Sequence, residues 1–358
     1  MYSCIVVRPR CGLLSILMSM NVLVTGGTGY IGSHTVVELL NAKHNVIIVD
    51  NFSNSSSEVL TRIEKITGRK PKFYYGDVQD RKKLNKIFQE NRVEAVIHFA
   101  GLKSIGESVK EPLAYYHNNI VSTLTLLEVM KENSIKQLIF SSSAAVYGQP
   151  ETLPLTETSR VGVGITNPYG RTKYMIEEIL NDLLVSDRRW AITSLRYFNP
   201  IGAHVSGLIG EDPNDIPNNL LPYITQVAVG KLDKLKVFGN DYDTPDGTGI
   251  RDYIHVVDLA KGHVAALEWF KASDKVDVYN LGTGKGASVM EVLHAFEKTC
   301  GKTIPYEIAG QRPGDIASCY ADVSNAKAKL KWQTKKTLEE ACVDSWRWQS
   351  QNPDGYTK

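Results

Sequence analysis

A tyrosine and a lysine four residues apart are the side chains in this sequence that most directly suggest a reaction. Tyr169 and Lys173 lie in the segment NPYGRTK, in which Asn167 suits the cap of a helix and Pro168 its first turn. Residues four apart share one face of a helix, so the two side chains are expected to be neighbours. A phenol has a pKa of about 10 and is a poor base at neutral pH, but a nearby ammonium lowers that pKa. The pair therefore predicts a proton acceptor for an alcohol that is being oxidised, although Y-x-x-x-K alone is a common pattern.

A glycine-rich segment near the start of the chain predicts a binding site for a dinucleotide. Gly27, Gly29 and Gly32 form G-x-G-x-x-G directly after the apolar run 21–25 and at the start of a helical pattern. Glycines allow a tight turn and let backbone N–H groups approach a pyrophosphate, and the helix N-terminus adds a partial positive charge. Asp50 ends the next apolar run, where a carboxylate accepts hydrogen bonds from a ribose hydroxyl and repels a 2′-phosphate. The combination favours NAD over NADP, and the positive nicotinamide ring of NAD is expected to act with the Lys173 ammonium in favouring the Tyr169 phenolate.

Polar or small residues follow three further apolar runs. They are Asp77, Phe99–Gly101 and Ser141–Ser143. Because ligands bind outside the carboxyl ends of parallel strands, Asp77 is expected near the adenine and Phe99–Gly101 over the cofactor, with Ser143 beside the reacting oxygen. Ordinary roles stay open, since Asp77 could solvate a turn and the serines could cap a strand end.

Short apolar runs alternating with helical patterns must position these residues. Buried strands are expected at 21–25, 45–49, 72–75, 95–99, 137–141 and 192–197, with helical patterns between them, for example at 31–40, 82–89 and 121–131. Alternation at this pitch predicts an α/β fold built on a doubly wound parallel Rossmann sheet. Beyond about Asn199, strands shorten and glycine and proline become more frequent, which predicts a second, smaller α/β domain for the substrate.

This pattern predicts three parts along the chain. Residues 20–199 are expected to form the NAD-binding domain and residues 200–358 the substrate domain, with the alternative that part of 250–275 returns to the first domain. Residues 1–19 precede a second start-like residue, Met20, and are expected to be an extension outside the fold. Basic residues before the short apolar run 13–18 keep a signal peptide or an organelle-targeting segment open as alternatives.

Composition narrows the possible functions. The chain has 358 residues, of which 42% are hydrophobic and 22% charged, as in ordinary globular proteins. A net charge of +2 provides no electrostatic footprint for nucleic acid or an anionic membrane, and no apolar run is long enough to span a bilayer. The five cysteines include no C-x-x-C pair, which argues against a metal site and a disulfide scaffold and fits a reducing, cytoplasmic compartment.

Longer motifs, taken in order, resemble a known family. The glycine loop, Asp50, the serines and Y-x-x-x-K are similar to the extended short-chain dehydrogenase/reductases. Six segments narrow the resemblance to the UDP-glucose 4-epimerase family: TGGTGYIGSH (25–34), HFAGLKSIGES (98–108), SSSAAVYG (141–148), LRYFNPIG (195–202), IPNNLL (216–221) and GTGIRDYIHVVD (247–258). The resemblance covers about 20–356.

The resemblance implies a role for each matching residue. Tyr169 matches the catalytic base, Lys173 the residue that lowers its pKa and binds the nicotinamide ribose, and Ser143 the hydroxyl that shares the proton path. The implied NAD contacts are Gly26, Gly29, Tyr30, Ile31, Asp50, Asn51, Asp77, Val78, Phe99, Ala100, Gly101, Lys103, Asn118, Tyr169, Lys173 and Tyr197. The implied contacts with the UDP-sugar are Ser143, Tyr169, Asn199, Asn219, Leu220, Lys236, Val237, Phe238, Arg251, Arg312, Asp315 and Cys319.

Within that second set, two arginines offer planar forks suited to a diphosphate. Alternatives stay open, because Arg251 could pair with Asp252 or Asp258 and Arg312 could lie in a solvated loop. Cys319 matches the position beside the sugar 2-substituent, where a small residue leaves space for an N-acetyl group. A small, inert core cysteine is the other interpretation.

The implied reaction is the NAD-dependent interconversion of UDP-glucose and UDP-galactose in galactose metabolism, extended by Cys319 to UDP-GlcNAc and UDP-GalNAc. Dehydratases of this fold carry an Asp-Glu pair after the fifth strand, where this chain has Ala144-Ala145. A sugar-nucleotide dehydrogenase or reductase is the nearest rival, and it would release NADH. A catalytically silent NAD-binding regulator is the rival from another class, and it would lack Tyr169 or Lys173. The family also implies a homodimer formed through a helical face.

Overall fold

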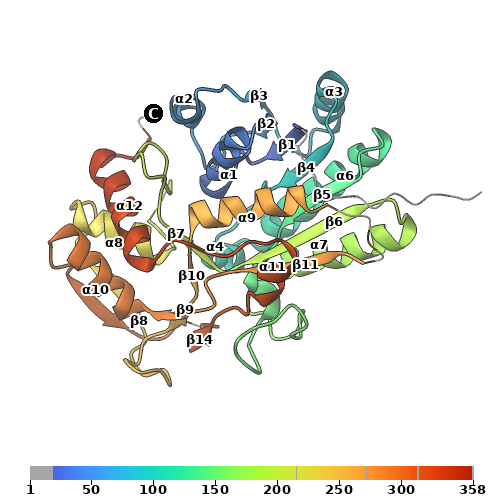
Figure 1. Cartoon of the computed structure of the whole chain (residues 1–358). Coiled ribbons are helices and arrows are strands. Elements are labelled where there is room, and N and C mark those ends of the chain that lie inside the picture. Colours follow the sequence, from blue (N-terminus) through green and yellow to red (C-terminus); the bar gives the residue numbers. More distant parts are fainter. Residues whose placement is uncertain (1–18, 215, 271–272, 274, 313, 357–358) are drawn as a thin grey trace, which may run out of the picture.

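A central sheet of seven parallel strands organises the chain in this computed structural model, which describes residues 19–214, 216–270, 273, 275–312 and 314–356. The predicted extension therefore lies, apart from Ser19, outside the described residues. The strands run in the order β11-β6-β5-β4-β1-β2-β3 (Figure 1). Their bounds are β1 Asn21–Thr25, β2 Asn45–Asp50, β3 Lys72–Tyr75, β4 Ala95–His98, β5 Gln137–Ser141, β6 Ala191–Tyr197 and β11 Asp277–Leu281.

Strand order creates a crevice at the middle of the sheet. From β1 the chain first builds outward through β2 and β3, and then crosses to β4 on the other side of β1 and continues through β5 and β6. At such a switch point the loops that follow neighbouring strands diverge, and ligands bind there. The predicted doubly wound parallel sheet is confirmed, and each of the six predicted strands is present.

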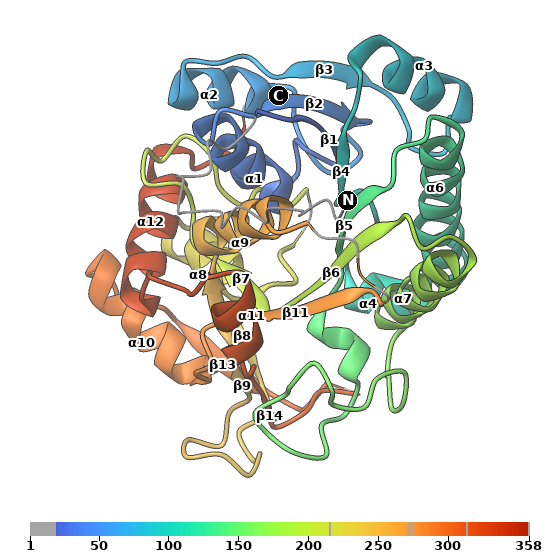
Figure 2. The same cartoon turned by 45° about the vertical axis from the view of Figure 1, so that its right-hand side comes forward.

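Helices cover both faces of the sheet because successive strand residues point to opposite sides. Val22 and Val24 join an apolar cluster with residues of α1 (Tyr30–Asn41), α2 (Glu58–Thr67) and α9 (Val256–Glu268). Leu23 lies in another cluster with residues of α3 (Arg81–Asn91), α6 (Ser122–Glu132) and α7 (Pro168–Ser186). Figure 2 shows the two layers on either side of the strands.

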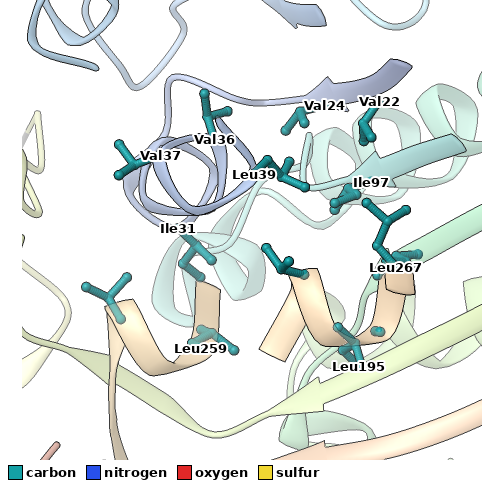
Figure 3. Close-up of a cluster of buried hydrophobic side chains, with 14 of the residues drawn as sticks. Val22, Val24, Ile31, Val36, Val37, Leu39, Ile97, Leu195, Leu259 and Leu267 are labelled. Atoms are coloured by element: carbon teal, nitrogen blue, oxygen red, sulfur yellow. The ribbon is translucent and has the colours of Figure 1, made fainter. Parts of the chain in front are cut away.

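Part of the C-terminal half lies on this sheet. In Figure 3, Leu259 and Leu267 of α9 face Ile31 and Leu39 of α1 across the first cluster. Strand β11 adds to the edge of the sheet beside β6. The sequence analysis did not identify β11 as a strand, because DVYNL has neither a continuous apolar run nor a clean alternation.

The rest of the C-terminal half forms three small sheets and a separate group of helices. The sheets pair β7 (Asn199–Ile201) with β10 (Tyr253–His255), β8 (Leu235–Phe238) with β13 (Tyr306–Ala309), and β9 (Ile250–Arg251) with β12 (Ala287–Ser288) and β14 (Ser318–Cys319). Helices α8 (Leu220–Ala228), α10 (Val289–Cys300) and α12 (Leu338–Gln351) enclose a third apolar cluster. α11 (Ser324–Lys329) packs against β11.

Local signals explain how the segments around the cleft begin. Asn167 caps α7 by accepting a hydrogen bond from the Gly170 N–H at 2.8 Å, with Pro168 as the first helical residue, as predicted. The short helices α4 (Ile105–Lys110) and α5 (Pro112–Tyr116) precede a π-helical turn, η1 (His117–Val121), which contains Asn118. The sequence predicted a helix from Val121 but not this turn. A 3₁₀ turn, η2 (Ala144–Tyr147), follows β5.

Candidate functional site

The predicted cofactor residues line one cleft at the carboxyl edge of the sheet. The cleft encloses about 980 Å³ when its solvent-filled mouth is included. All of the predicted NAD contacts are among its lining residues: Gly26, Gly29, Tyr30, Ile31, Asp50, Asn51, Asp77, Val78, Phe99, Ala100, Gly101, Lys103, Asn118, Tyr169, Lys173 and Tyr197. Ser53, Asn54 and Ser122 also line it, and the sequence analysis missed them, since isolated polar residues in turns and helices carry no pattern.

The glycine loop at one end of the cleft suits a pyrophosphate. α1 begins at Tyr30 after Gly29 with no side-chain cap and no acidic residue in its first turn, so its N-terminal N–H groups have no anionic competitor from their own helix. Asp50 holds the loop by accepting hydrogen bonds from the Thr28 N–H at 3.0 Å and the Phe52 N–H at 2.9 Å. Its two oxygens can accept further bonds. Loop, helix end and acid therefore fit the phosphates and ribose of a dinucleotide.

Two of the glycines have steric reasons to be glycine. Gly26 has a φ of +68°, and a Cβ on it would lie 2.8 Å from the Ala100 nitrogen. A Cβ on Gly32 would lie 2.2 Å from the Gly26 carbonyl oxygen, which is backbone and cannot rotate away. The turn and the helix start are therefore packed directly on one another.

We expect Gly32→Ala to lose the cofactor, because the added methyl group must push α1 away from the loop whose N–H groups face the cleft. NAD released from the denatured, purified protein should fall at least ~10-fold relative to wild type, since close backbone approach is what the motif provides. Gly106→Ala is the matched control, because a Cβ there meets nothing within 4 Å. Equal NAD content in wild type and Gly32→Ala would contradict this account of the loop.

Asp77 serves its own turn as well as lining the cleft. Its carboxylate accepts hydrogen bonds from the Gln79 N–H at 2.8 Å and from the Asn51 amide at 3.0 Å. The turn-solvating role left open by the sequence is therefore present. Asn51 and Asp77 follow neighbouring strands, β2 and β3, so this bond also joins two loops of the cleft.

The other end of the cleft holds Tyr169 and Lys173, both buried. Tyr169 is hydrogen-bonded to Ser143. The Lys173 ammonium donates a hydrogen bond to the Ser141 carbonyl at 2.7 Å and lies 5.9 Å from the centre of the Tyr169 ring. Tyr197 is hydrogen-bonded to the Ser141 hydroxyl at 2.8 Å. Ser143 also caps η2 by accepting from the Ala145 N–H at 3.2 Å, which is the strand-end role the sequence had left open.

Burial shifts the pKa values of both members of this pair. Burial raises the pKa of Tyr169 above its ordinary value, and the hydrogen bond from Ser143 only partly opposes that effect. Burial also lowers the pKa of Lys173 to about 8, which the charge of Glu177 partly opposes. The predicted effect on the Tyr169 pKa requires the Lys173 ammonium together with a positive nicotinamide ring, so it stays a prediction for the protein with its cofactor bound. A positive charge in the cleft would oppose the effect of burial and favour the phenolate.

A second group of predicted residues lies around β8, β9 and β14. The Arg312 guanidinium stacks 4.7 Å from the centre of the Phe238 ring and pairs with Asp315 at 2.9 Å. Arg251 faces the same carboxylate at 3.9 Å. Cys319 is the partner of Arg251 in the β9–β14 pairing. The structure thus brings two cations, an aromatic face and a carboxylate together, a set that suits a nucleoside diphosphate.

The alternatives for the two arginines are resolved by this geometry. The Asp252 carboxylate accepts hydrogen bonds from Thr283, Gly284 and Ala321, and Asp258 accepts from two backbone N–H groups. Neither forms the ion pair with Arg251 that the sequence had left open. Arg312 is half-exposed, but it is held by Phe238 and Asp315 and does not lie freely in solvent.

The remaining predicted substrate contacts differ in how far their side chains are available. Lys236 is exposed, whereas the Val237 side chain is 1% exposed in the third apolar cluster, so Val237 has only its backbone to offer a ligand. Asn199 is exposed at the start of β7, and Leu220 begins α8. Asn219 precedes Leu220, and its amide donates a hydrogen bond to Glu211 at 2.7 Å.

Cys319 lies in a small apolar cluster. It is 9% exposed and packs with Val146, Tyr147 and Phe198, with Ala144 at the margin. Burial raises the pKa of its thiol to about 11, so the side chain is a neutral, compact group at physiological pH. It therefore combines both interpretations that the sequence had left open: a small core residue, next to Arg251.

Known proteins share this arrangement. The NAD dependent epimerase/dehydratase family matches residues 22–282, and the chain belongs to this family. The chain is 60% identical over 337 residues to a UDP-glucose 4-epimerase of Bacillus subtilis, covering 94% of this chain and 99% of that protein. It is 55% identical over 343 residues to a UDP-glucose 4-epimerase of Drosophila melanogaster, with 94% and 98% covered.

Solved structures agree. The UDP-glucose 4-epimerase of Bifidobacterium longum, in complex with NAD+ and UDP, superposes with a TM-score of 0.91 at 56% identity, covering 94% of this chain and all of that one. Similarity also extends to the UDP-Glc/GlcNAc 4-epimerase of Campylobacter jejuni, with a TM-score of 0.81, 38% identity and 93% and 100% covered. Within the described residues, no helix is both long and apolar enough to cross a membrane, and no group of acidic, histidine or cysteine side chains is arranged to hold a metal ion.

Proposed function

We propose that this protein interconverts UDP-glucose and UDP-galactose by inverting C4 of the hexose, with NAD as its resident cofactor. The observation that carries the proposal is the buried Tyr169–Lys173 pair, with Ser143, at one end of a cleft whose other end is the glycine loop. The similarity to UDP-glucose 4-epimerases over nearly the whole chain supports it.

The chemistry of the residues that line the cleft fits NAD. Backbone N–H groups of the glycine loop and α1 would hold the pyrophosphate, Asp50 the adenosine ribose, and Lys173 the nicotinamide ribose. When bound, NAD accepts a hydride from C4 of the hexose and returns it to the opposite face, so the reaction has no net oxidation. Its positive ring would also supply the charge that the Tyr169 phenolate needs in this buried place.

The side chains of this protein move the proton. Tyr169 accepts the proton of the C4 hydroxyl, and Ser143 shares the path through its hydrogen bond to Tyr169. Lys173, fixed on the Ser141 carbonyl, holds its ammonium beside the ring. In the return step the same phenol donates the proton back. Tyr169 thus needs no second acid or base, which agrees with alanines at 144 and 145.

The UDP group has to stay bound while the hexose turns over. Arg251 and Arg312 would grip the diphosphate, Phe238 and the backbone at Val237 would border the uracil beside Lys236, and Asp315 would bind the uridine ribose. Asn199, Asn219 and Leu220 would complete the contacts. We propose accordingly that residues 20–199 bind mainly the cofactor and residues 200–358 mainly the UDP-sugar, even though α9 and β11 pack on the cofactor side.

The decisive assay converts UDP-galactose to UDP-glucose with no added nucleotide. We expect turnover sustained by retained NAD, with no accumulation of NADH. Stoichiometric release of NADH would instead indicate a sugar-nucleotide dehydrogenase. Purified protein that contains no NAD and shows no turnover would contradict the proposal.

We further propose that UDP-GlcNAc and UDP-GalNAc are substrates, because the compact, neutral Cys319 lies beside Arg251. Cys319→Tyr is expected to lower kcat/KM for the N-acetyl pair about 10-fold or more, since a bulky ring excludes a larger substituent, while the UDP-glucose pair retains most of its activity. Cys319→Ala, which keeps the space open, is the control. Wild type that ignores the N-acetyl pair, or a tyrosine variant that processes it normally, would contradict this extension.

We also propose a cytoplasmic homodimer. The three described cysteines, Cys300, Cys319 and Cys342, are free thiols, which suits a reducing compartment. Exposed apolar side chains are concentrated on α4, α5 and α7, which pack on one another: Ile105, Val109, Leu113, Met175 and Val185. A second copy covering this surface would remove it from water. Light scattering that shows a monomer at micromolar concentration would contradict the dimer.

A further inference from the structure

A glutamate outside every predicted set links the two halves of the candidate site. The Oε1 atom of Glu211 accepts a hydrogen bond from the Lys103 ammonium at 3.0 Å and another from the Asn219 amide at 2.7 Å. Lys103 lines the cofactor cleft, and Asn219 is among the predicted UDP-sugar contacts. One carboxylate oxygen therefore holds a cation from the loop after β4 and an amide from the start of α8.

Glu211 is itself fixed. Its side chain is only 10% exposed, and its backbone carbonyl accepts a hydrogen bond from the indole of the buried Trp348 at 3.2 Å. Its charge also contributes, after burial, to the raised pKa of Tyr30 on the glycine loop. Burying a carboxylate costs free energy unless cations or hydrogen-bond donors pair with it, and Glu211 lies beside a cleft suited to anions.

The orientation of Asn219 shows what Glu211 does to its partner. Asn219 occupies the N-cap of α8, where an asparagine ordinarily accepts a hydrogen bond from the first turn. Here it makes no such cap, and its amide is turned to Glu211 instead. Lys103 also depends on Glu211 for its orientation. Its side chain is 47% exposed, and an unpaired lysine there would sample many rotamers.

A neighbouring contact ties the same two segments together. Next to Lys103 and Asn219, the Asn218 amide donates a hydrogen bond to the Ser104 hydroxyl at 3.1 Å. This second bond joins the two segments without Glu211. Substitutions at Glu211 are therefore expected to alter mainly the orientation of the two side chains.

We propose that Glu211 is a positioning residue that orients Lys103 toward the cofactor and Asn219 toward the UDP-sugar, so that cofactor retention and substrate binding depend on one carboxylate. The proposal rests on the proposed function for the identity of the two ligands. It predicts that removal of the carboxylate weakens the binding of both the cofactor and the UDP-sugar. Removal of its charge alone should weaken the binding of the cofactor but not that of the UDP-sugar.

The test compares Glu211→Ala with Glu211→Gln. Alanine removes both hydrogen bonds, so KM for UDP-galactose and the rate of NAD loss during gel filtration should each rise about 10-fold, while kcat falls less than 3-fold. Glutamine keeps an oxygen for Asn219 but no charge for Lys103, so NAD loss should rise while KM stays within 3-fold of wild type. The control is Glu128→Gln. Glu128 is an exposed glutamate on α6 that pairs with Arg81 of α3, and its substitution should change neither quantity.

The outcomes separate the two proposals. Wild-type protein without epimerase activity would overturn the proposed function itself. Active wild type, with Glu211→Ala unchanged in KM and NAD loss, would overturn the role of Glu211 alone. A lower melting temperature with unchanged KM and NAD loss would make Glu211 merely structural and would also overturn its positioning role.

Discussion

Replacing Tyr169 with phenylalanine is expected to lower kcat for UDP-galactose about 1,000-fold, within the range that general acid–base groups contribute. The phenylalanine ring fills the same buried place but has no phenolic oxygen to accept the proton of the C4 hydroxyl, as proposed for Tyr169, or to bond with Ser143. The measurement is the rate of UDP-glucose formation by protein whose NAD content has been determined.

Two comparisons make this result specific. NAD content and melting temperature of Tyr169→Phe should stay near wild type, because the variant removes one hydroxyl and leaves the other cleft residues in place. Tyr174→Phe, one position beyond Lys173 on the same helix, should retain nearly full turnover, since Tyr174 packs against Gly162 in the loop before α7. If Tyr169→Phe kept more than a tenth of wild-type turnover, the proton acceptor would have to be another group.

The parallel sheet explains why the cofactor cleft could be predicted from the sequence. Strands β1 to β5 are short, mainly apolar runs that end in glycine, acid or serine or are followed by one within three residues, and parallel strands bring those ends to one edge. A residue directly after a run is then placed by topology alone, as for Asp50 and Phe99. Asn118 depends on a π-helical turn, for which the sequence has no periodic signal, so its position followed only from the resemblance.

The substrate region could not be derived in this way. β9 and β14 have two residues each, too few for any alternation, yet their pairing is what sets Cys319 beside Arg251. Buried and exposed residues alternate along β8, so the side chain of Val237 is buried and only its backbone is available to a ligand. This alternation can be recognised only when the third apolar cluster is known. Glu211 carries no signal at all, because its two partners are 108 and 8 residues away along the chain.

Electrostatics was the least predictable property. Sequence spacing places Lys173 near Tyr169, but the sign of the net effect depends on how deeply both are buried. In the folded protein desolvation prevails for each, raising the tyrosine pKa and lowering that of the lysine to about 8. A positively charged ligand in the cleft would oppose the effect of burial on the tyrosine pKa.

Beneath this pair, a buried ion pair predicts the second large effect, this time on stability. Glu177 on α7 and Arg196 on β6 are 4% and 5% exposed, and they pair at 2.6 Å. Burial alone would lower the pKa of Arg196, but the hydrogen bond and charge of Glu177 raise it overall. Glu177→Gln leaves the guanidinium buried without a counter-charge, so the free energy of unfolding should fall by about 3–5 kcal/mol. Thermal unfolding should show a melting temperature lower by roughly 5 °C or more.

The ion pair also contacts the segment that follows β5, because Glu177 accepts a hydrogen bond from the Ser142 hydroxyl at 2.6 Å, next to Ser143. A double variant, Glu177→Leu with Arg196→Met, removes both charges and should be more stable than Glu177→Gln, since no unpaired charge stays buried. Glu178→Gln, exposed on the same helix, is the matched control and should unfold like wild type. Equal melting temperatures for Glu177→Gln and Glu178→Gln would mean that Arg196 finds another partner, such as the Tyr147 hydroxyl at 3.2 Å, and would contradict the proposed dependence of this layer on one carboxylate.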